Sequence, residues 1–278
     1  MKIILGIDIG STSTKIIGIN QASEIVGKAK AKTGNRLISM YGAMGKLLHE
    51  QGLTYSDVEK IALTGAGSSW IDADEIHGIK VLKVSETAAV GAGALALSGL
   101  SEALVMNIGT GTVFVHADGA DAKHVGGSGL GGATLVGLAG KMIGENNVKK
   151  ISELGSKGDL KKIDLMIGDV YNRSFSFLPA EASAANFGKF ANDASNADIA
   201  LGLLSMIYQV LGTMAVFAGR GCGEVPILVT GALAELAQAE QILPLVGGLY
   251  GANFVFCENP MYTTAYGAAL EAKKIRGD

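Results

Sequence analysis

Two glycine-rich turns, one in each half of the chain, constrain the fold more than any other feature. The first lies in residues 6–15 (GIDIGSTSTK) and the second in residues 106–112 (MNIGTGT). Each turn follows an apolar strand and leads into another. Glycine lets the main chain approach a ligand closely, so that N–H groups and hydroxyls of such a turn can face phosphate oxygens. Two such hairpins predict two lobes that hold a nucleotide between them.

The segments around the turns predict a similar order of elements twice, with three strands first and then alternating helices and strands. The expected fold is therefore α/β and duplicated, with residues 1–101 as one lobe and 102–278 as the other. In the first lobe, strands are expected at 2–9, 14–20, 24–31, 60–64 and 79–84, with helices at 36–51 and 86–98. In the second lobe, strands are expected at 103–108, 112–117, 121–125, 225–230 and 253–257, with helices ending near 143, spanning 195–220 and spanning 264–274.

The composition excludes several classes of function. A formal net charge of −3 offers no basic surface for nucleic acid. The two cysteines, Cys222 and Cys257, are far apart and lack CxxC spacing, so we expect neither a disulfide nor a zinc site, and a cytoplasmic location. Residues 199–219 carry no charge and are long enough to span a bilayer. Polar side chains interrupt them, however, and we expect a buried helix of a soluble protein rather than a membrane span.

Two charged side chains flank the first turn. Asp8 stands between two isoleucines at the end of a strand, where a carboxylate is costly to bury without a partner. It is either a Mg²⁺ ligand beside nucleotide phosphates, directly or through water, or a structural residue satisfied by the N–H groups of residues 10–12. Lys15, on the returning strand, either reaches a phosphate or is simply solvated.

Glu86 is the best candidate for a catalytic base. It begins the helix that follows the strand at 79–84, with Ser85 as the expected N-cap. The unpaired N–H groups and the dipole of a helix favour an ionised acid in its first turn. A base that accepts a proton from a substrate hydroxyl must be ionised. The alternative is that Glu86 only serves to start the helix.

Five glycines in residues 126–132 precede an apolar helix. Open N–H groups at the start of such a helix form a natural anion site. We therefore expect this run to contact phosphate, with a flexible linker as the alternative.

Together these segments resemble a known group of proteins. Residues 6–15 look like the first phosphate motif of the actin/hexokinase/Hsp70 ATPase superfamily, and the chain is more narrowly similar to the type II pantothenate kinases. The similarity covers nearly the whole chain, in the order found in the family. Besides the first turn, it rests on residues 84–89 (VSETAA), 107–112 (NIGTGT), 125–127 (VGG), 131–132 (GG) and 183–188 (SAANFG).

The resemblance implies a duplicated ribonuclease H-like (actin-like ATPase) fold, in which mixed sheets are flanked by helices. It implies that a cytoplasmic homodimer transfers the γ-phosphate of ATP, with Mg²⁺, to a hydroxyl of pantothenate in the first step of coenzyme A biosynthesis. It makes Glu86 the general base and places Asp8 beside the metal. His124, Gly109 and Gly126 would contact the acceptor. The nucleotide would be contacted by Gly10, Ser11, Thr12, Ser13, Thr14, Lys15, Thr110, Gly132, Ala133, Thr134, Leu135 and Val136.

One position departs from the family pattern. The family typically has an arginine just before the VGG segment, where it contacts the pantothenate carboxylate, whereas this chain has His124 preceded by Lys123. A neutral imidazole cannot form the bidentate charged pair that arginine gives. Either Lys123 or a protonated His124 takes its place, or the acceptor lacks that carboxylate. Glu181 also stands where the family often has aspartate.

Other classes of function stay open. One is a kinase of another small hydroxylated metabolite, such as a sugar, although sugar kinases of this superfamily usually use an aspartate base. Another is an ATP-dependent activator of a 2-hydroxyacyl-CoA dehydratase, whose opening motif is very close to this one. Such activators hold an iron–sulfur cluster through Cys-Ala-Ala-Gly-like segments, and neither Cys222 nor Cys257 has that context. A nucleotide sensor without enzymatic activity is the third alternative.

Overall fold

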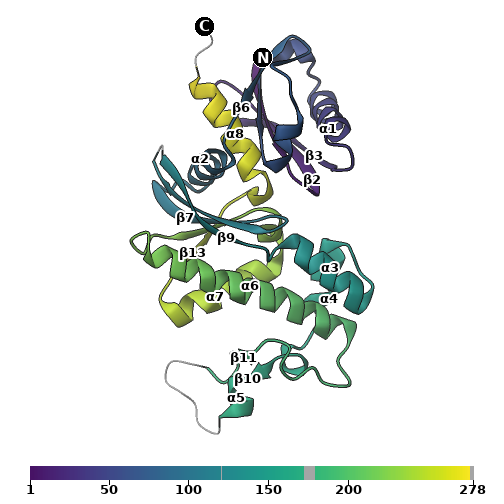
Figure 1. Cartoon of the computed structure of the whole chain (residues 1–278), viewed down its shortest axis with the longest axis vertical. Coiled ribbons are helices and arrows are strands. Elements are labelled where there is room, and N and C mark those ends of the chain that lie inside the picture. The colour runs from purple at the N-terminus through teal and green to yellow at the C-terminus, as the bar shows by residue number, and fades with distance from the viewer. Residues whose placement is uncertain (120, 172–178, 276–278) are drawn as a thin grey trace.

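A computed structural model, which describes residues 1–119, 121–171 and 179–275, divides the chain into two lobes, each built on one large sheet (Figure 1). The first sheet has six strands. Their order across the sheet is β3 (Ile25–Lys32), β2 (Ser13–Ile19), β1 (Ile3–Ile9), β4 (Val58–Thr64), β6 (Ile79–Lys83) and β5 (Glu75–Ile76). Strand β1 is antiparallel to β2 and parallel to β4, so the sheet is mixed.

The second sheet repeats this arrangement with five strands. Their order is β9 (Asp121–Ser128), β8 (Thr112–Asp118), β7 (Glu102–Ile108), β12 (Ile227–Thr230) and β13 (Phe254–Phe256). Strand β7 is antiparallel to β8 and parallel to β12, as β1 is to β2 and β4. The order β9-β8-β7-β12-β13 matches β3-β2-β1-β4-β6 strand for strand. The duplicated α/β fold expected from the sequence is therefore confirmed.

Helices cover the outer faces of both sheets. On the first sheet, α1 (Arg36–Glu50) packs Met40, Met44 and Leu47 against the isoleucines of β1. On the second sheet, the outer face is covered mainly by α6 (Asn196–Arg220) and α7 (Ala237–Tyr250), with α3 (Gly132–Ile143) and α4 (Val148–Gly155) at one end. Apolar residues at helical spacing on these helices thus form the largest core of each lobe.

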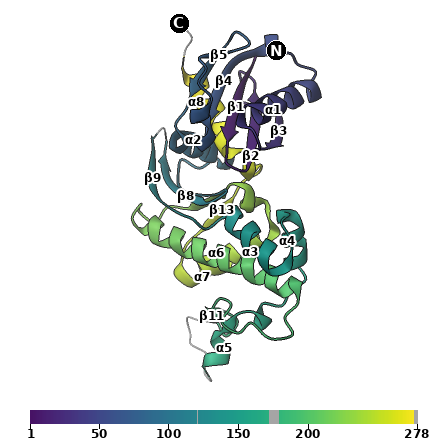
Figure 2. The same ribbon diagram turned by 45° about the vertical axis from the view of Figure 1, so that its right-hand side comes forward.

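Two helices lie between the sheets, and each packs on the sheet of the other half (Figures 1 and 2). Helix α2 (Glu86–Ser98) comes from the first half but packs Val90 and Ala94 against the second sheet. Helix α8 (Thr263–Lys274), from the end of the chain, packs Ala265 and Ala269 against the first sheet. The expected boundary between residues 101 and 102 lies between α2 and β7 and stays a proposal.

Helices α2 and α8 cross at very short range because glycine stands at the contact. A Cβ atom at Gly267 would lie 1.8 Å from the carbonyl oxygen of Ala89, and one at Gly93 would lie 2.0 Å from the carbonyl oxygen of Thr263. No larger side chain fits at these positions without separating the helices. This crossing therefore fixes the two sheets relative to each other.

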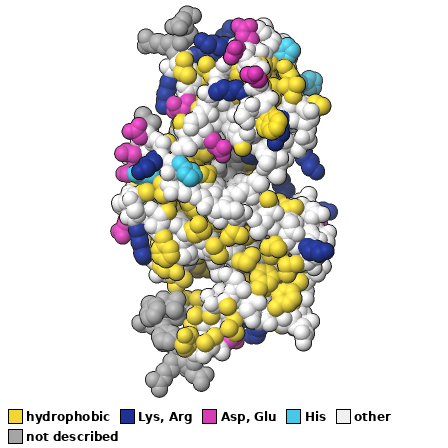
Figure 3. All heavy atoms as spheres, in the orientation of Figure 1, with side chains coloured by type: hydrophobic (Ala, Val, Ile, Leu, Met, Phe, Trp, Pro, Cys, Tyr) yellow, Lys and Arg dark blue, Asp and Glu magenta, His cyan; other side chains and the backbone are white. Residues whose placement is uncertain are grey.

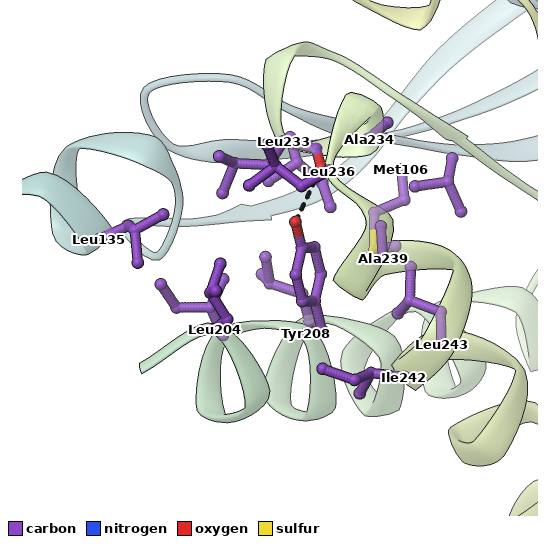
Figure 4. Packing of buried hydrophobic residues seen from close by; sticks show 14 of the residues in the cluster. Met106, Leu135, Leu204, Tyr208, Leu233, Ala234, Leu236, Ala239, Ile242 and Leu243 are labelled. Atoms are coloured by element: carbon purple, nitrogen blue, oxygen red, sulfur yellow. Dashed lines mark hydrogen bonds between the residues drawn. The ribbon is translucent and has the colours of Figure 1, made fainter. Parts of the chain in front are cut away.

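The long apolar segment forms α6, a core helix of the second lobe. It is apolar and long enough to cross a membrane, but 67% of its most apolar window is buried inside the molecule. Figure 4 shows the fully buried Tyr208, whose hydroxyl donates a hydrogen bond of 2.8 Å to the carbonyl of Leu233. Burial raises the pKa of this phenol well above its ordinary value. The bond ties α6 to the 3₁₀ turn η4 (Ala232–Glu235), which follows β12.

The family-specific segment 183–188 lies beyond α6, on the side away from the second sheet (Figures 1 and 2). There β10 (Leu165–Met166) pairs with β11 (Ser183–Ala185), next to the short helix α5 (Ile167–Val170). The fully buried carboxylate of Asp164 accepts hydrogen bonds from Ser183 Oγ, Asn186 Nδ2 and the Phe187 N–H. These bonds satisfy the buried charge, so the segment has a structural role in this chain. The remaining 3₁₀ turns are η1 (Tyr55–Asp57), η2 (Ala66–Trp70), η3 (Leu160–Lys162) and η5 (Pro260–Tyr262).

Candidate active site

The two glycine-rich turns meet at the boundary between the lobes. Ser11 Oγ lies 2.8 Å from Thr110 Oγ1, and Thr12 Oγ1 lies 3.4 Å from the same atom. The first turn is closed by the Gly10 N–H, which donates to the carbonyl of Ser13 at 3.1 Å. Residues on both expected phosphate turns are therefore in direct contact across the boundary between the lobes.

A polar row crosses the first sheet below these turns. Asp8 on β1 pairs in register with Thr64 on β4 and with Lys15 on β2. Paired residues of adjacent strands point to the same face. Lys15 Nζ donates to Asp8 Oδ2 at 2.9 Å, and the two side chains are only 12% and 10% exposed. The partner of Asp8 is thus Lys15 and not the N–H groups of residues 10–12, and Lys15 is not simply solvated.

The second sheet carries the counterpart of this row. Asn107 on β7 pairs with Thr230 on β12, and Thr230 Oγ1 donates to Asn107 Oδ1 at 3.2 Å. A glycine follows each threonine with positive φ, +83° at Gly65 and +91° at Gly231. A Cβ atom at Gly65 would lie 2.4 Å from Asp8 Oδ1, so only glycine lets this loop pass the carboxylate. The structural duplication therefore extends to the site itself.

Thr64 is a site residue that sequence reasoning missed. Its hydroxyl is fully buried next to Asp8 and has no hydrogen-bond partner, unlike that of Thr230. An unpartnered buried hydroxyl is costly. A ligand oxygen or a water beside Asp8 would satisfy it. The signal was available in the sequence, because the triplet Thr-Gly-Ala occurs at the end of a strand in both halves, at residues 64–66 and 230–232.

Glu86 begins α2 and lies close enough to Asp8 and Lys15 to feel both charges. Its pKa is raised above the ordinary value, first because the carboxyl is desolvated and second because the Asp8 carboxylate is near, whereas Lys15 acts in the opposite direction. We expected the helix start to hold Glu86 ionised, and the shift has the opposite sign. Ser85 occupies the N-cap position but makes no side-chain capping bond. A carboxyl with a raised pKa is better suited to act as a proton acceptor than an ordinary one.

The glycine run differs in part from the expectation. Gly126 and Gly127 belong to strand β9, and the helix α3 begins only at Gly132. The Gly132 N–H donates to the carbonyl of Gly109 at 2.8 Å, and the Ala133 N–H donates to Thr110 at 3.0 Å. These groups are not open to an anion, because they hold the second turn in place. Of the first three N–H groups of α3, only that of Thr134 is not bonded to the second turn in the described structure.

The geometry of β2 and α3 also shows which of the other expected nucleotide-binding residues share the face of Asp8 and which lie behind the turns. Ser13 and Lys15 share the face of Asp8, whereas Thr14 points to the opposite face, where its buried hydroxyl lies 2.8 Å from Ser39 Oγ. Leu135 is fully buried in the core of the second lobe and its N–H donates to Gly131. Thr14 and Leu135 therefore support the turns from behind, while the nucleotide contacts of the whole set stay a prediction.

The structure places His124 and Lys123 on opposite faces of the second sheet. His124 pairs with Val115, a core residue under α2, on the face toward the helix that starts at Glu86. Lys123 pairs with His116 on the other face, where its charge lowers the pKa of Cys222, although burial of that thiol acts more strongly and raises it. Of the two candidates to replace the family arginine, only His124 lies on the side of α2.

The residues around Asp8 fit a magnesium ion. Among the described residues there is no group of three or more His, Cys, Asp or Glu side chains that could hold a metal. Magnesium bound to a nucleotide needs only one or two carboxylates, since phosphates and waters supply the other oxygens. Asp8 offers one carboxylate oxygen that is not bonded to Lys15, and the unpartnered Thr64 hydroxyl lies in register with it.

Comparison with known proteins finds relatives that match nearly the whole chain. The family model described as Fumble matches residues 100–239. The type II pantothenate kinase of Bacillus cereus (strain G9842) is 26% identical over 99% of this chain and 100% of its own length. Further type II pantothenate kinases, from Staphylococcus epidermidis and Staphylococcus aureus, are 29% and 24% identical over 60% and 95% of this chain. The resemblance expected from the motifs is thereby confirmed.

Solved structures show the same fold at lower identity. The (R)-2-hydroxyglutaryl-CoA dehydratase component A of Acidaminococcus fermentans superposes with a TM-score of 0.72 over 99% of this chain and 98% of its own, at 20% identity. A ROK family glucokinase from Streptomyces griseus, in complex with glucose and AMPPNP, superposes with a TM-score of 0.64 over 98% and 100%, at 13% identity. At these identities the likeness shows the fold alone, and it confirms the expected actin-like ATPase architecture.

Proposed function

The chain belongs to the Fumble family, and we propose that it is an ATP-dependent kinase that phosphorylates pantothenate, the first step of coenzyme A biosynthesis. One observation carries the proposal. Asp8, Lys15 and the carboxyl of Glu86 converge beside two glycine-rich turns that touch across the lobes. This is the set of groups that phosphoryl transfer needs, because the reaction depends on positioning and on charge stabilisation rather than on covalent chemistry.

Each group has a separate task in this mechanism. Glu86 accepts the proton of the acceptor hydroxyl as that oxygen attacks the γ-phosphorus of ATP, and the bond from the γ-phosphorus to the β–γ bridging oxygen breaks, so that ADP leaves. Hydroxyl and N–H groups of the two turns hold the phosphates, and Lys15 adds a positive charge next to them. Asp8, with one free carboxylate oxygen, and Thr64 would hold Mg²⁺ or its waters. The ion supplies charge neutralisation on the phosphates.

We further propose a cytoplasmic homodimer that binds neither nucleic acid nor membrane. Two free cysteines and a net charge of −3 agree with that location and with the lack of such partners. Exposed apolar side chains support a subunit contact on the second lobe, where hydrophobic surface gathers on the face shown in Figure 3. They include Phe217 on α6 and Leu245, Leu249 and Tyr250 on α7.

The replacement Glu86→Gln tests the proposal. It keeps the size of the side chain but removes the proton acceptor, so pantothenate phosphorylation should fall by about 10²–10⁴-fold while binding of Mg·ATP is retained. Turnover is measured with purified protein, Mg·ATP and pantothenate, and binding is measured by calorimetry. Glu75→Gln, at an exposed position on β5, is the matched control and should behave as wild type. A Glu86→Gln variant that retains more than about a tenth of wild-type turnover rejects Glu86 as the base.

Because His124 stands where the family typically has an arginine, the identity of the acceptor is the part of the proposal that most needs testing. Purified protein should be assayed with Mg·ATP against pantothenate, pantetheine and a panel of sugars. Turnover of pantothenate supports the proposal, and turnover of a sugar alone assigns the chain to another class of kinase. ATP hydrolysis without any acceptor, in a protein with the colour of an iron–sulfur cluster, would instead indicate the dehydratase activator.

A further inference from the structure

The polar row of the first sheet extends one strand further than the catalytic groups require. Lys30 on the edge strand β3 pairs in register with Lys15 on β2. Thr64, Asp8, Lys15 and Lys30 therefore form a continuous row across four neighbouring strands, and their side chains point to one face.

Lys30 is the unneutralised cation of this row. Lys15 is paired with Asp8 at 2.9 Å, whereas Lys30 has neither a hydrogen bond nor an ion pair within the described part of the chain. Two lysines directly opposite each other on adjacent strands repel and destabilise the sheet. Lys30 is exposed at the edge of the sheet, where its ammonium group can reach a ligand.

The second lobe shows that the fold does not need these charges. Its equivalent row runs from Thr230 through Asn107 and Val113 to Gly127, with the same pairing of strands. In place of the two lysines it has an apolar side chain and a glycine. The cations of the first lobe are thus an addition to a framework that is stable without them.

Lys30 faces the second lobe. Its strand neighbour on the same face, Lys28, donates to Asn259 Oδ1 and lies 5.4 Å above the ring of Tyr262, both in or beside η5. The pKa of Lys30 is lowered, first by partial burial and then by Lys15, while Glu235 of η4 acts in the opposite direction and Lys149 of α4 has the smallest effect. Lys30 thus lies within electrostatic reach of groups from both lobes.

The order of the residues in the row indicates how a bound nucleotide would be oriented. Glu86 follows β6, beyond β4, and so lies at the end of the row opposite to Lys30 on β3. Proton transfer and attack on the γ-phosphorus take place at the Glu86 end. A nucleotide that runs along the row would therefore have its other phosphates toward β3.

We propose that Lys30, beside Lys15, binds the phosphate groups of ATP that lie nearest the nucleoside. This inference rests on the proposed function in that a nucleotide binds between the lobes and Glu86 is the base. Phosphate oxygens between Lys15 and Lys30 would relieve the repulsion between the two ammonium groups.

The test is the affinity for Mg·ADP, which needs no acceptor. In Lys30→Met the dissociation constant of ADP, measured by calorimetry, should rise about tenfold, as expected for the loss of one charged contact to phosphate. The affinity for adenosine should not change, and Lys30→Arg should restore most of the ADP affinity. Lys80→Met is the control, because Lys80 is an exposed strand lysine near the opposite edge of the same sheet.

The outcomes separate this inference from the proposed function. The inference is wrong if Lys30→Met binds ADP as tightly as wild type does. It is also wrong if the affinity for adenosine falls as much as the affinity for ADP. Either result overturns it even when pantothenate is phosphorylated. If ADP affinity depends on Lys30 but no pantothenate is turned over, the inference holds and the proposed acceptor is wrong. With pantothenate as acceptor, the KM of ATP should rise in Lys30→Met while the KM of pantothenate stays the same.

Discussion

At the scale of single residues, the negative charge of Asp8 raises the pKa of the neighbouring Glu86. A carboxylate next to another carboxyl group disfavours its ionisation, and the Asp8 charge is the second cause, after burial, of the raised pKa of Glu86. Since the base must be ionised, turnover should be low below the pKa of Glu86 and should rise as the pH climbs through it.

This coupling predicts the effect of Asp8→Asn on Glu86. Removing the neighbouring charge should lower the pKa of Glu86, while burial keeps it above the ordinary value of 4.5. The measurement is a carboxyl ¹³C NMR titration of Glu86 in both proteins, with the pH dependence of wild-type kcat/KM beside it. An identical Glu86 titration in the two proteins would show that Asp8 exerts no such effect.

Thr64 and Thr230 provide a matched pair of residues for a second prediction. Thr64→Val removes an unpartnered hydroxyl, so the melting temperature should stay the same or rise, while turnover falls at least tenfold if that hydroxyl serves the nucleotide or its metal. Thr230→Val breaks the bond to Asn107 and should cost about 1 kcal/mol of stability. Full activity in Thr64→Val would exclude the hydroxyl from the site.

At the scale of elements, the crossing of α2 and α8 is the contact that permits least change. Gly267→Ala places a methyl group against the Ala89 carbonyl, so we expect the variant to lose about 1–3 kcal/mol or more in the free energy of unfolding. Gly42→Ala in α1 is the control, because a Cβ atom there meets nothing within 4 Å. In a helix interior that change should stabilise the protein by about 0.5–1 kcal/mol. Urea denaturation measures both, and equal stability of the two variants would contradict the close crossing.

At the scale of the whole molecule, the site exists only when both lobes are in place. The first turn lies on the first sheet and the second turn on the second, and they meet through Ser11 and Thr110. A ligand that binds both lobes should stabilise both.

Mg·ADP at 100 times its dissociation constant should therefore stabilise the protein by about 2.7 kcal/mol. In hydrogen exchange, protection should increase in the strands that lead into both turns, β1 and β2 as well as β7 and β8. Protection confined to one sheet would show that the nucleotide binds to a single lobe.

The sequence alone determined the architecture and the main chemical groups, because both are written in local patterns. Apolar runs, glycine turns and helical spacing act over a few residues, so strands, helices and their duplicated order follow from neighbouring side chains. The same holds for the two turns, for Asp8 at a strand end and for Glu86 at a helix start.

What only the tertiary structure decided depends on strand pairing and on the crossing of helices. The pairing of Asp8 with Lys15 and Thr64, and the extension to Lys30, require the register of four strands, which distant parts of the chain set together. The direction of the pKa shift of Glu86 depends on the burial of its carboxyl and on the position of Asp8, which only the folded chain defines. The α3 N–H groups bond to the second turn, and His124 and Lys123 lie on opposite faces of the sheet. Both features depend on tertiary contacts that cannot be predicted from neighbouring residues.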